Sequence, residues 1–379
     1  MTRGHTNDAR TAGEPAGPTT ATPTGTAASL AAALAPAPAP ADKATAAKAT
    51  AVGSTAVTPK GSTAAGAPLG TVRRVLRATA IAATFPYLAL KSAWVAGSHI
   101  GIPEGSVLRG SSLFWPVVNT MTLLMDAALV VLVLALTRPW GRRIPSWLLL
   151  VPGFVASGLL TPIVTGFPAQ LLMRAFGVGG DTAGQAPREP FLDGWVFNVV
   201  YAGFSVQAFA LAGLFVPYAK ERWGHLWRRP TGLSAGLRTV AVAAAAGALA
   251  FAGAEAYWTL GGTAGLTDAL VAARDADAVM VGIVQALCTL MGAAGALLLA
   301  FGRGAAGRIP LAAAWVGGAA AASWGLWVSL AALAPGGDPA KKITWALHLA
   351  YAGQMITGLL VAVVLTGFLT GFLAARRPA

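Results

Sequence analysis

Long apolar runs separated by short polar segments occupy the chain from about residue 75 to its end. Most runs hold about 20 residues or more, which is the length that a helix needs to cross a hydrocarbon layer of about 30 Å. The pattern predicts an all-α membrane protein with eight transmembrane helices. The predicted spans are residues 75–97, 114–136, 144–166, 195–219, 239–260, 278–301, 309–333 and 345–374.

Residues 1–70 lack this pattern. They are rich in Ala, Pro and Thr and contain no aromatic residue, so they cannot bury enough apolar area to offset the entropy of ordering. We expect a disordered cytoplasmic tail at 1–70, a first four-helix repeat at 71–230 and a second at 231–379.

Composition strengthens the membrane prediction, because 55% of the residues are hydrophobic and only 11% are charged, against about 25% charged in soluble domains. The net charge of +13 does not indicate nucleic-acid binding, because the basic residues lie mainly in short loops between apolar runs. We therefore expect the lipid bilayer as a partner and no nucleic acid.

The distribution of Lys and Arg predicts the orientation. One side of the predicted membrane has fifteen: Arg73, Arg74, Arg77, Arg138, Arg142, Arg143, Lys220, Arg222, Arg228, Arg229, Arg238, Arg303, Arg308, Arg376 and Arg377. The other side has six: Arg109, Arg174, Arg188, Arg274, Lys341 and Lys342. Positive charge accumulates on the cytoplasmic side, so both termini are predicted inside the plasma membrane.

Four sequence patterns recur in the same order in the two halves. Trp195-x-x-Asn198-x-x-Tyr201 matches Trp345-x-x-His348-x-x-Tyr351, and Lys91-x-x-Trp94-x-x-Gly97 matches Glu255-x-x-Trp258-x-x-Gly261. The segments 143–145 and 308–310 both read Arg-Ile-Pro, and Leu-Met precedes both Asp126 and Gly292. These matches predict an internal duplication. An even number of spans per repeat gives both the same orientation, with a pseudo-twofold axis along the membrane normal.

Ionisable residues inside a span are costly and are functional candidates for that reason. Lys91 and Glu255 occupy matched positions near the outer ends of their spans. One hypothesis is an intramembrane Lys91–Glu255 ion pair across the pseudo-twofold axis. The alternative is that each side chain extends separately to the outer surface.

Asp126 lies near the middle of its predicted span, and its matched position in the second half is Gly292. Asn119 lies two turns earlier on the same helix face. A proton- or cation-coupled path would use such a carboxyl group; a hydrogen bond to a neighbouring helix is the alternative.

Asn198, Tyr201, His348 and Tyr351 lie in the outer turns of their spans. They predict either a polar vestibule or an aromatic belt at the membrane surface. Gly367-x-x-x-Gly371 permits close helix approach and leaves a homodimer open.

No motif for nucleotide binding, hydrolysis or zinc-dependent proteolysis is present. We therefore expect no catalytic centre, no metal site and no cofactor.

The stretches FPYLALKSAWVAG (85–97) and GWVFNVVYAG (194–203) resemble uncharacterised multi-pass membrane proteins of the actinomycete type. This resemblance implies a membrane location and no particular activity. Two functions are compatible with the sequence. One is a transporter of a small solute or ion with a polar path between the repeats, and the other is a scaffold or accessory subunit.

Overall fold

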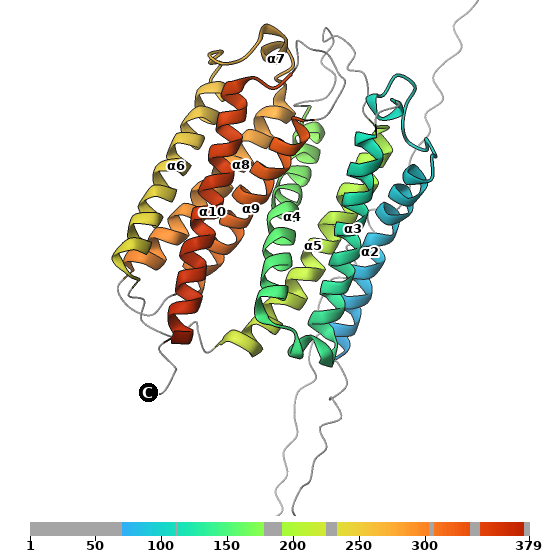
Figure 1. Ribbon diagram of the computed structural model, residues 1–379. Coiled ribbons are helices and arrows are strands. Elements are labelled where there is room, and N and C mark those ends of the chain that lie inside the picture. The colour runs from blue at the N-terminus through green and yellow to red at the C-terminus, as the bar shows by residue number, and fades with distance from the viewer. Residues whose placement is uncertain are drawn as a thin grey trace, which may run out of the picture. The chain divides into compact units, whose positions relative to one another are not determined.

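The computed structural model describes residues 70–110, 113–177, 192–224, 233–302, 307–333 and 342–374. The predicted tail lies outside these ranges, apart from Gly70. Nine α-helices are found in the described residues (Figure 1): α2 (Thr71–Val95), α3 (Phe114–Thr137), α4 (Ser146–Ala175), α5 (Gly194–Trp223), α6 (Ala235–Thr259), α7 (Asp268–Ala272), α8 (Ala276–Phe301), α9 (Arg308–Ala331) and α10 (Trp345–Ala374).

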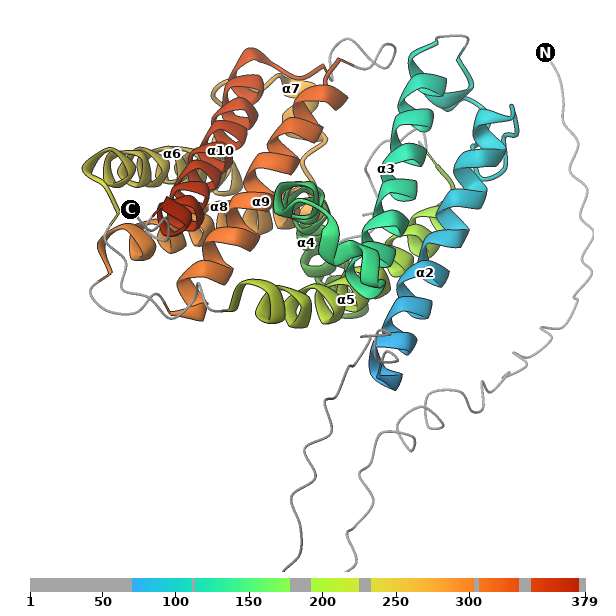
Figure 2. The ribbon, with the colours of Figure 1, turned by 60° about the horizontal axis from the view of Figure 1, so that its bottom comes forward.

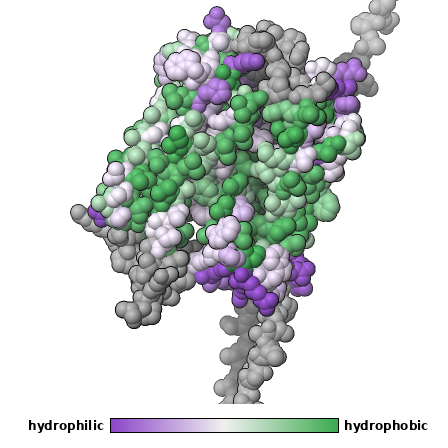
Figure 3. All heavy atoms as spheres, viewed as in Figure 1, coloured by the Kyte–Doolittle hydropathy of each residue, from purple (hydrophilic) through white to green (hydrophobic). Residues whose placement is uncertain are grey.

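Seven of the described helices, α3 to α6 and α8 to α10, are long and apolar enough to cross a membrane. Large apolar side chains such as Phe85, Phe209 and Leu349 are about two-thirds exposed on the outside of the bundle. Figure 3 shows hydrophobic residues over the middle of the visible face and hydrophilic residues toward its two ends. The protein is therefore a multi-pass helical membrane protein.

The helix at the first predicted span, α2, differs from the prediction. Helix α2 has 25 residues but is not among those seven helices. Arg73, Arg74 and Arg77 occupy its first two turns, and Lys91 and Pro86 interrupt its apolar part. These residues lower its mean hydropathy.

The two halves pair their helices in the same way. In the first half, α2 packs on α3 and α5, and α4 packs on α3 and α5. In the second half, α6 packs on α8 and α10, and α9 packs on α8 and α10. Helices at matched positions in the sequence therefore have matched neighbours.

Glycine makes the second half the more closely packed. A Cβ atom at Gly292 or Gly317 would collide with the backbone of the facing helix, and the same holds for Gly325 and Gly358. In the first half, α3 and α4 meet over a smaller surface. The position matched to Gly292 is Asp126, whose side chain cannot allow such a close approach.

Helix α4 connects the halves, because it packs on α9 and also on α8 (Figure 2). Gly158 of α4 touches the backbone of Ala319 and the hydroxyl of Ser323. Trp324 of α9 donates a 3.1 Å hydrogen bond to the carbonyl of Leu159. The contact between the halves is thus made mainly by the matched helices α4 and α9.

One predicted boundary needs correction. The third span was predicted to end at residue 166, but α4 continues to Ala175 because Pro168 is accommodated inside the helix. Gly367, which the sequence marks as a position of close helix approach, lies against Leu237 of α6. This glycine therefore serves packing inside the bundle.

Candidate functional site

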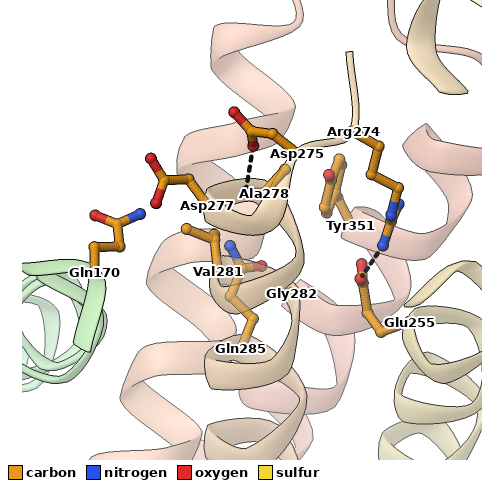
Figure 4. Close-up of a pocket in the computed structure, with 10 residues that line it drawn as sticks. All are labelled: Gln170, Glu255, Arg274, Asp275, Asp277, Ala278, Val281, Gly282, Gln285 and Tyr351. Carbon is orange, nitrogen blue, oxygen red and sulfur yellow. Dashed lines mark hydrogen bonds and ion pairs between the residues drawn. The ribbon is translucent and has the colours of Figure 1, made fainter. Parts of the chain in front are cut away.

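A polar pocket of about 370 Å³ lies where α6 ends and α8 and α10 begin, which we call the α7 end. It is lined by residues of α4, α6, α8, α10 and the connection before α8 (Figure 4). The lining residues are Gln170, Glu255, Arg274, Asp275, Asp277, Ala278, Val281, Gly282, Gln285 and Tyr351.

Glu255 and Arg274 form the charged centre of the pocket. A guanidinium nitrogen of Arg274 lies 3.5 Å from a carboxylate oxygen of Glu255. Glu255 is only 6% exposed. Figure 4 shows Arg274 reaching down from the connection toward Glu255 on α6. The Nε atom of Arg274 is buried and has no hydrogen-bond partner among the described residues. Part of the hydrogen-bonding capacity of this ion pair is therefore unused.

Glycine at position 282 creates the space for this carboxylate. A Cβ atom there would collide with Oε2 of Glu255, which Gly282 faces from α8. Gly282 therefore leaves room for the ion pair between α8 and α6.

The turn after α6 holds the ion pair from the other side. Trp258 donates a 3.1 Å hydrogen bond from Nε1 to the carbonyl of Ala264, and Gly261 permits the turn with φ of +95°. The guanidinium of Arg274 lies 6.0 Å from the centre of the Trp258 ring, within the range of a cation–π contact. The connection is thus anchored above the helix end.

Acidic residues at the start of α8 form the edge of the pocket. Asp277 pairs with Arg174 of α4 at 2.8 Å, and its other oxygen is buried without a hydrogen-bond partner among the described residues. Asp275 caps α8 by accepting a 2.8 Å hydrogen bond from the backbone of Ala278. Gln170 of α4 points toward Asp277 in Figure 4.

Uncharged polar residues lie below the ion pair. Gln285 lines the pocket and is 5% exposed. One turn further along α8, Thr289 accepts a 3.5 Å hydrogen bond from Gln354 of α10. The close glycine contacts of α8, α9 and α10 follow toward the middle of the bundle.

The first half contains a second buried polar cluster. The ammonium of Lys91 donates a 2.7 Å hydrogen bond to Oδ1 of Asn119 and lies about 5 Å from the rings of Tyr87 and Trp94. Asp126 is 7% exposed and interacts electrostatically with Lys91. Its Oδ2 atom has no hydrogen-bond partner among the described residues. Asn119 and Asp126 lie two turns apart on the same face of α3, and this face is directed toward Lys91 of α2.

The turn after α2 repeats the turn after α6. Trp94 donates a 2.8 Å hydrogen bond to the carbonyl of Ile100, six residues later, as Trp258 does to Ala264. Gly97 and Gly261 both have positive φ.

A second glycine follows at the same distance in both turns. Gly101 meets Val196 at the start of α5, and Gly265 meets Ala346 at the start of α10. Both have positive φ, so the first and fourth helices of each half are joined by the same local geometry.

The expected Lys91–Glu255 pair is not among the ion pairs of the described residues. Lys91 bonds to Asn119 and Glu255 to Arg274, and in Figures 1 and 2 α2 and α6 lie on opposite sides of α4 and α9. Neither side chain extends to the surface, since both are buried. The contact of α4 with α9 separates the two positions.

The other candidates fall into two groups. Asn198 and His348 are exposed on their helices, whereas Tyr201 and Tyr351 are partly buried. Tyr201 makes edge contacts with the rings of Phe167 and Phe197, and Tyr351 lines the pocket.

Sequence reasoning missed Arg274, which it counted only as a loop charge. Its position immediately before Asp275, the N-cap of α8, was the available signal, because it places the arginine beside the end of the preceding span.

Among the described residues, no group of three or more His, Cys, Asp or Glu is arranged to hold a metal ion. Comparisons with models of protein families, with curated proteins and with solved structures find no match to this chain. The resemblance to actinomycete-type membrane proteins therefore stays a prediction.

Proposed function

We propose that the protein is a plasma-membrane transporter with eight spans in two parallel four-helix repeats, and that it binds a small solute in the pocket at the α7 end. Both termini are cytoplasmic in this proposal, so the pocket opens to the outside. The observation that carries it is the Glu255–Arg274 pair, which is buried at the end of a membrane-crossing helix and lines a pocket.

The energetic argument concerns the burial of charge. Removing charged groups from water costs several kcal/mol for each ion, and a mutual attraction repays this only when the geometry is good and the remaining hydrogen-bonding groups are satisfied. The 3.5 Å contact and the unpartnered Nε of Arg274 leave this requirement partly unmet. A polar solute in the pocket would supply the missing hydrogen bonds.

The charges of the lining indicate the class of solute. Three carboxyl groups and one guanidinium line the pocket, and Arg174 balances one of the carboxylates. Groups of both charges therefore line the pocket. We propose a small zwitterion, whose ammonium faces the carboxylates and whose acidic group faces Arg274.

The repeat arrangement is supported by the matched turns after α2 and α6 and by the matched helix neighbours. A crossing by α2 is supported by its 25 residues and by the internal partners of its only buried cation, Lys91. The pseudo-twofold axis would pass near the contact of α4 with α9.

The proposed site differs from the expected polar path along the repeat interface. The polar groups lie inside each half and at the edge of α4, whereas the groove between the halves is mainly apolar. In this proposal, movement of α4 against α8 would open the pocket, because the Arg174–Asp277 pair and Gln170 join these two helices there.

The test starts with solute binding to the full-length protein in lipid nanodiscs. We expect at least one member of a panel of amines, amino acids, sugars and carboxylates to raise the thermal midpoint, and Glu255→Gln to abolish this rise. Asp268→Asn is the matched control, because it removes a carboxylate at the same end outside the pocket. Flux of the binding solute into proteoliposomes then tests transport.

The alternative of a scaffold or accessory subunit is favoured by one observation, the close glycine contacts that follow the pocket toward the middle of the bundle. Binding without flux would indicate this non-transporting role. No binding by any member of the panel, or equal loss in Asp268→Asn, would contradict the proposed site.

A further inference from the structure

A second cavity, different in character from the polar pocket, lies between the two halves. It has a volume of about 640 Å³ and is lined mainly by α4, α5 and α9. Helix α4 contacts both α5 and α9 and so joins the two walls. We call this cavity the interface groove.

The groove is apolar along most of its length. On its α4 side, lining residues run from Ser146 to Thr165, a distance of about 28 Å at about 1.5 Å per residue. This is close to the hydrocarbon thickness of a bilayer, about 30 Å. Leu160, Phe215 and Leu311 are among the apolar residues of its walls.

Three of the four hydroxyl groups in the lining already donate hydrogen bonds within α4. Ser157 donates to the carbonyl of Gly153 at 2.7 Å, Thr161 to that of Ser157 at 2.6 Å, and Thr165 to that of Thr161 at 2.9 Å. The indole nitrogen of Trp315 donates to the hydroxyl of Ser157 at 3.2 Å. The walls therefore present little to a polar solute and suit a hydrocarbon chain.

Two cations lie at one end of the groove. Lys220, near the end of α5, and Arg308, at the start of α9, both line it and are exposed. Neither takes part in an ion pair within the described residues. The neighbouring Glu221 is paired instead with Arg73 and Arg142. Within the part of the chain that the structure describes, no anion pairs with either cation at this end of the groove.

We propose that the interface groove binds an anionic membrane phospholipid. Its acyl chains lie between α5 and α9 against α4, and its phosphate lies between Lys220 and Arg308. Basic pockets between transmembrane helices bind anionic head groups in this way, and the apolar walls add contact area that a phosphate alone cannot use. The lipid would join the two halves on one side of α4.

The test compares lipids that share acyl chains and differ in charge. Delipidated full-length protein is supplemented with phosphatidylglycerol, phosphatidylcholine or inorganic phosphate, and the thermal midpoint is measured. We expect phosphatidylglycerol to raise the midpoint more than phosphatidylcholine does, and phosphate to have no effect. The same rise with both lipids, or a rise with phosphate alone, would overturn the proposal.

Charge variants distinguish lipid binding in the groove from non-specific attraction of anionic lipid to basic residues at the same end. The pair Lys220→Gln and Arg308→Gln should remove the difference between the lipids. The control pair, Arg138→Gln and Arg143→Gln, removes two charges at the same end outside the groove and should retain it. Equal loss in both pairs would mean non-specific attraction and would overturn the proposal.

A filling variant tests the apolar part. Ala312 is exposed and lines the groove, so Ala312→Trp should reduce the phospholipid that copurifies, measured as phosphorus per protein. Ala128→Trp, on an exposed position of α3 outside the groove, should not. If Ala312→Trp instead converts a dimer into a monomer and leaves bound phospholipid unchanged, the groove is a subunit interface and the proposal is wrong.

Discussion

At the scale of single residues, the buried charges at the matched positions 91 and 255 have local partners. Lys91 is held by Asn119 and two aromatic rings in the first half. Glu255 is held by Arg274 in the second. The charge on the first helix of each half is opposite in sign. Lys91 meets a neutral amide and two rings, whereas Glu255 meets a cation. Each half thus stabilises a buried charged side chain at the matched position, but with different partner residues.

The first prediction concerns the coupling of Lys91 with Asp126. Lys91→Met should destabilise the protein, because it removes the 2.7 Å hydrogen bond to Asn119 and the cation nearest to buried Asp126; a buried polar group left without its partner costs about 1–3 kcal/mol. Asp126→Asn added to Lys91→Met should recover part of this loss. Thermal midpoints of the two single variants and the double variant measure the coupling. Strictly additive effects would show that the two side chains do not interact.

At the scale of helices, small residues decide which surfaces meet. Position 292 is glycine in α8 and allows close contact with α9, whereas its counterpart in α3 is Asp126, and α3 meets α4 over less surface. Helix α4 instead makes its close contact with α9, through Gly158. The difference between the halves in this packing coincides with glycine in α8 at positions where α3 has a larger side chain.

The second prediction tests this contact. Gly158→Ala should lower the thermal midpoint, because its Cβ would collide with Ala319 and Ser323, and overpacking of a close contact costs about 1–3 kcal/mol. Gly166→Ala is the matched control on the same helix, since nothing lies within 4 Å of its added Cβ. A midpoint that falls equally in both variants would rule out the α4–α9 contact as the cause.

At the scale of the whole molecule, the remaining question is whether α2 crosses the membrane. Seven described helices are apolar enough by composition, and α2 differs from them by its terminal arginines and Lys91. If α2 crosses, Thr71 and Glu104 lie on opposite sides of the membrane. If it does not, they lie on the same side.

The third prediction uses the exposed positions Thr71, Glu104 and Arg138. In a Cys288→Ala background, Glu104→Cys should react with an impermeant maleimide added to intact cells. Thr71→Cys and Arg138→Cys should react only after permeabilisation. Labelling of Thr71→Cys in intact cells would contradict the eight-span arrangement with its termini inside.

The sequence by itself determined the helical membrane class and the approximate position of each long helix, because a run of apolar residues is a local property and the bilayer acts on it directly. It also indicated the matched turns, since Trp94 and Trp258 bond within six residues of themselves. Lys91, Asp126 and Glu255 were recognisable as candidates because charge is rare in such runs.

Only the tertiary structure decided which residues these candidates meet. The partner of Glu255 is Arg274 from the following connection, and Lys91 is separated from Glu255 by the α4–α9 contact. The sequence could not decide this, because glycine and alanine are frequent in most of the spans and many helix pairings are compatible with the same pattern. The actual pairing depends on side-chain fit between segments far apart in the chain, such as Gly158 against Ala319.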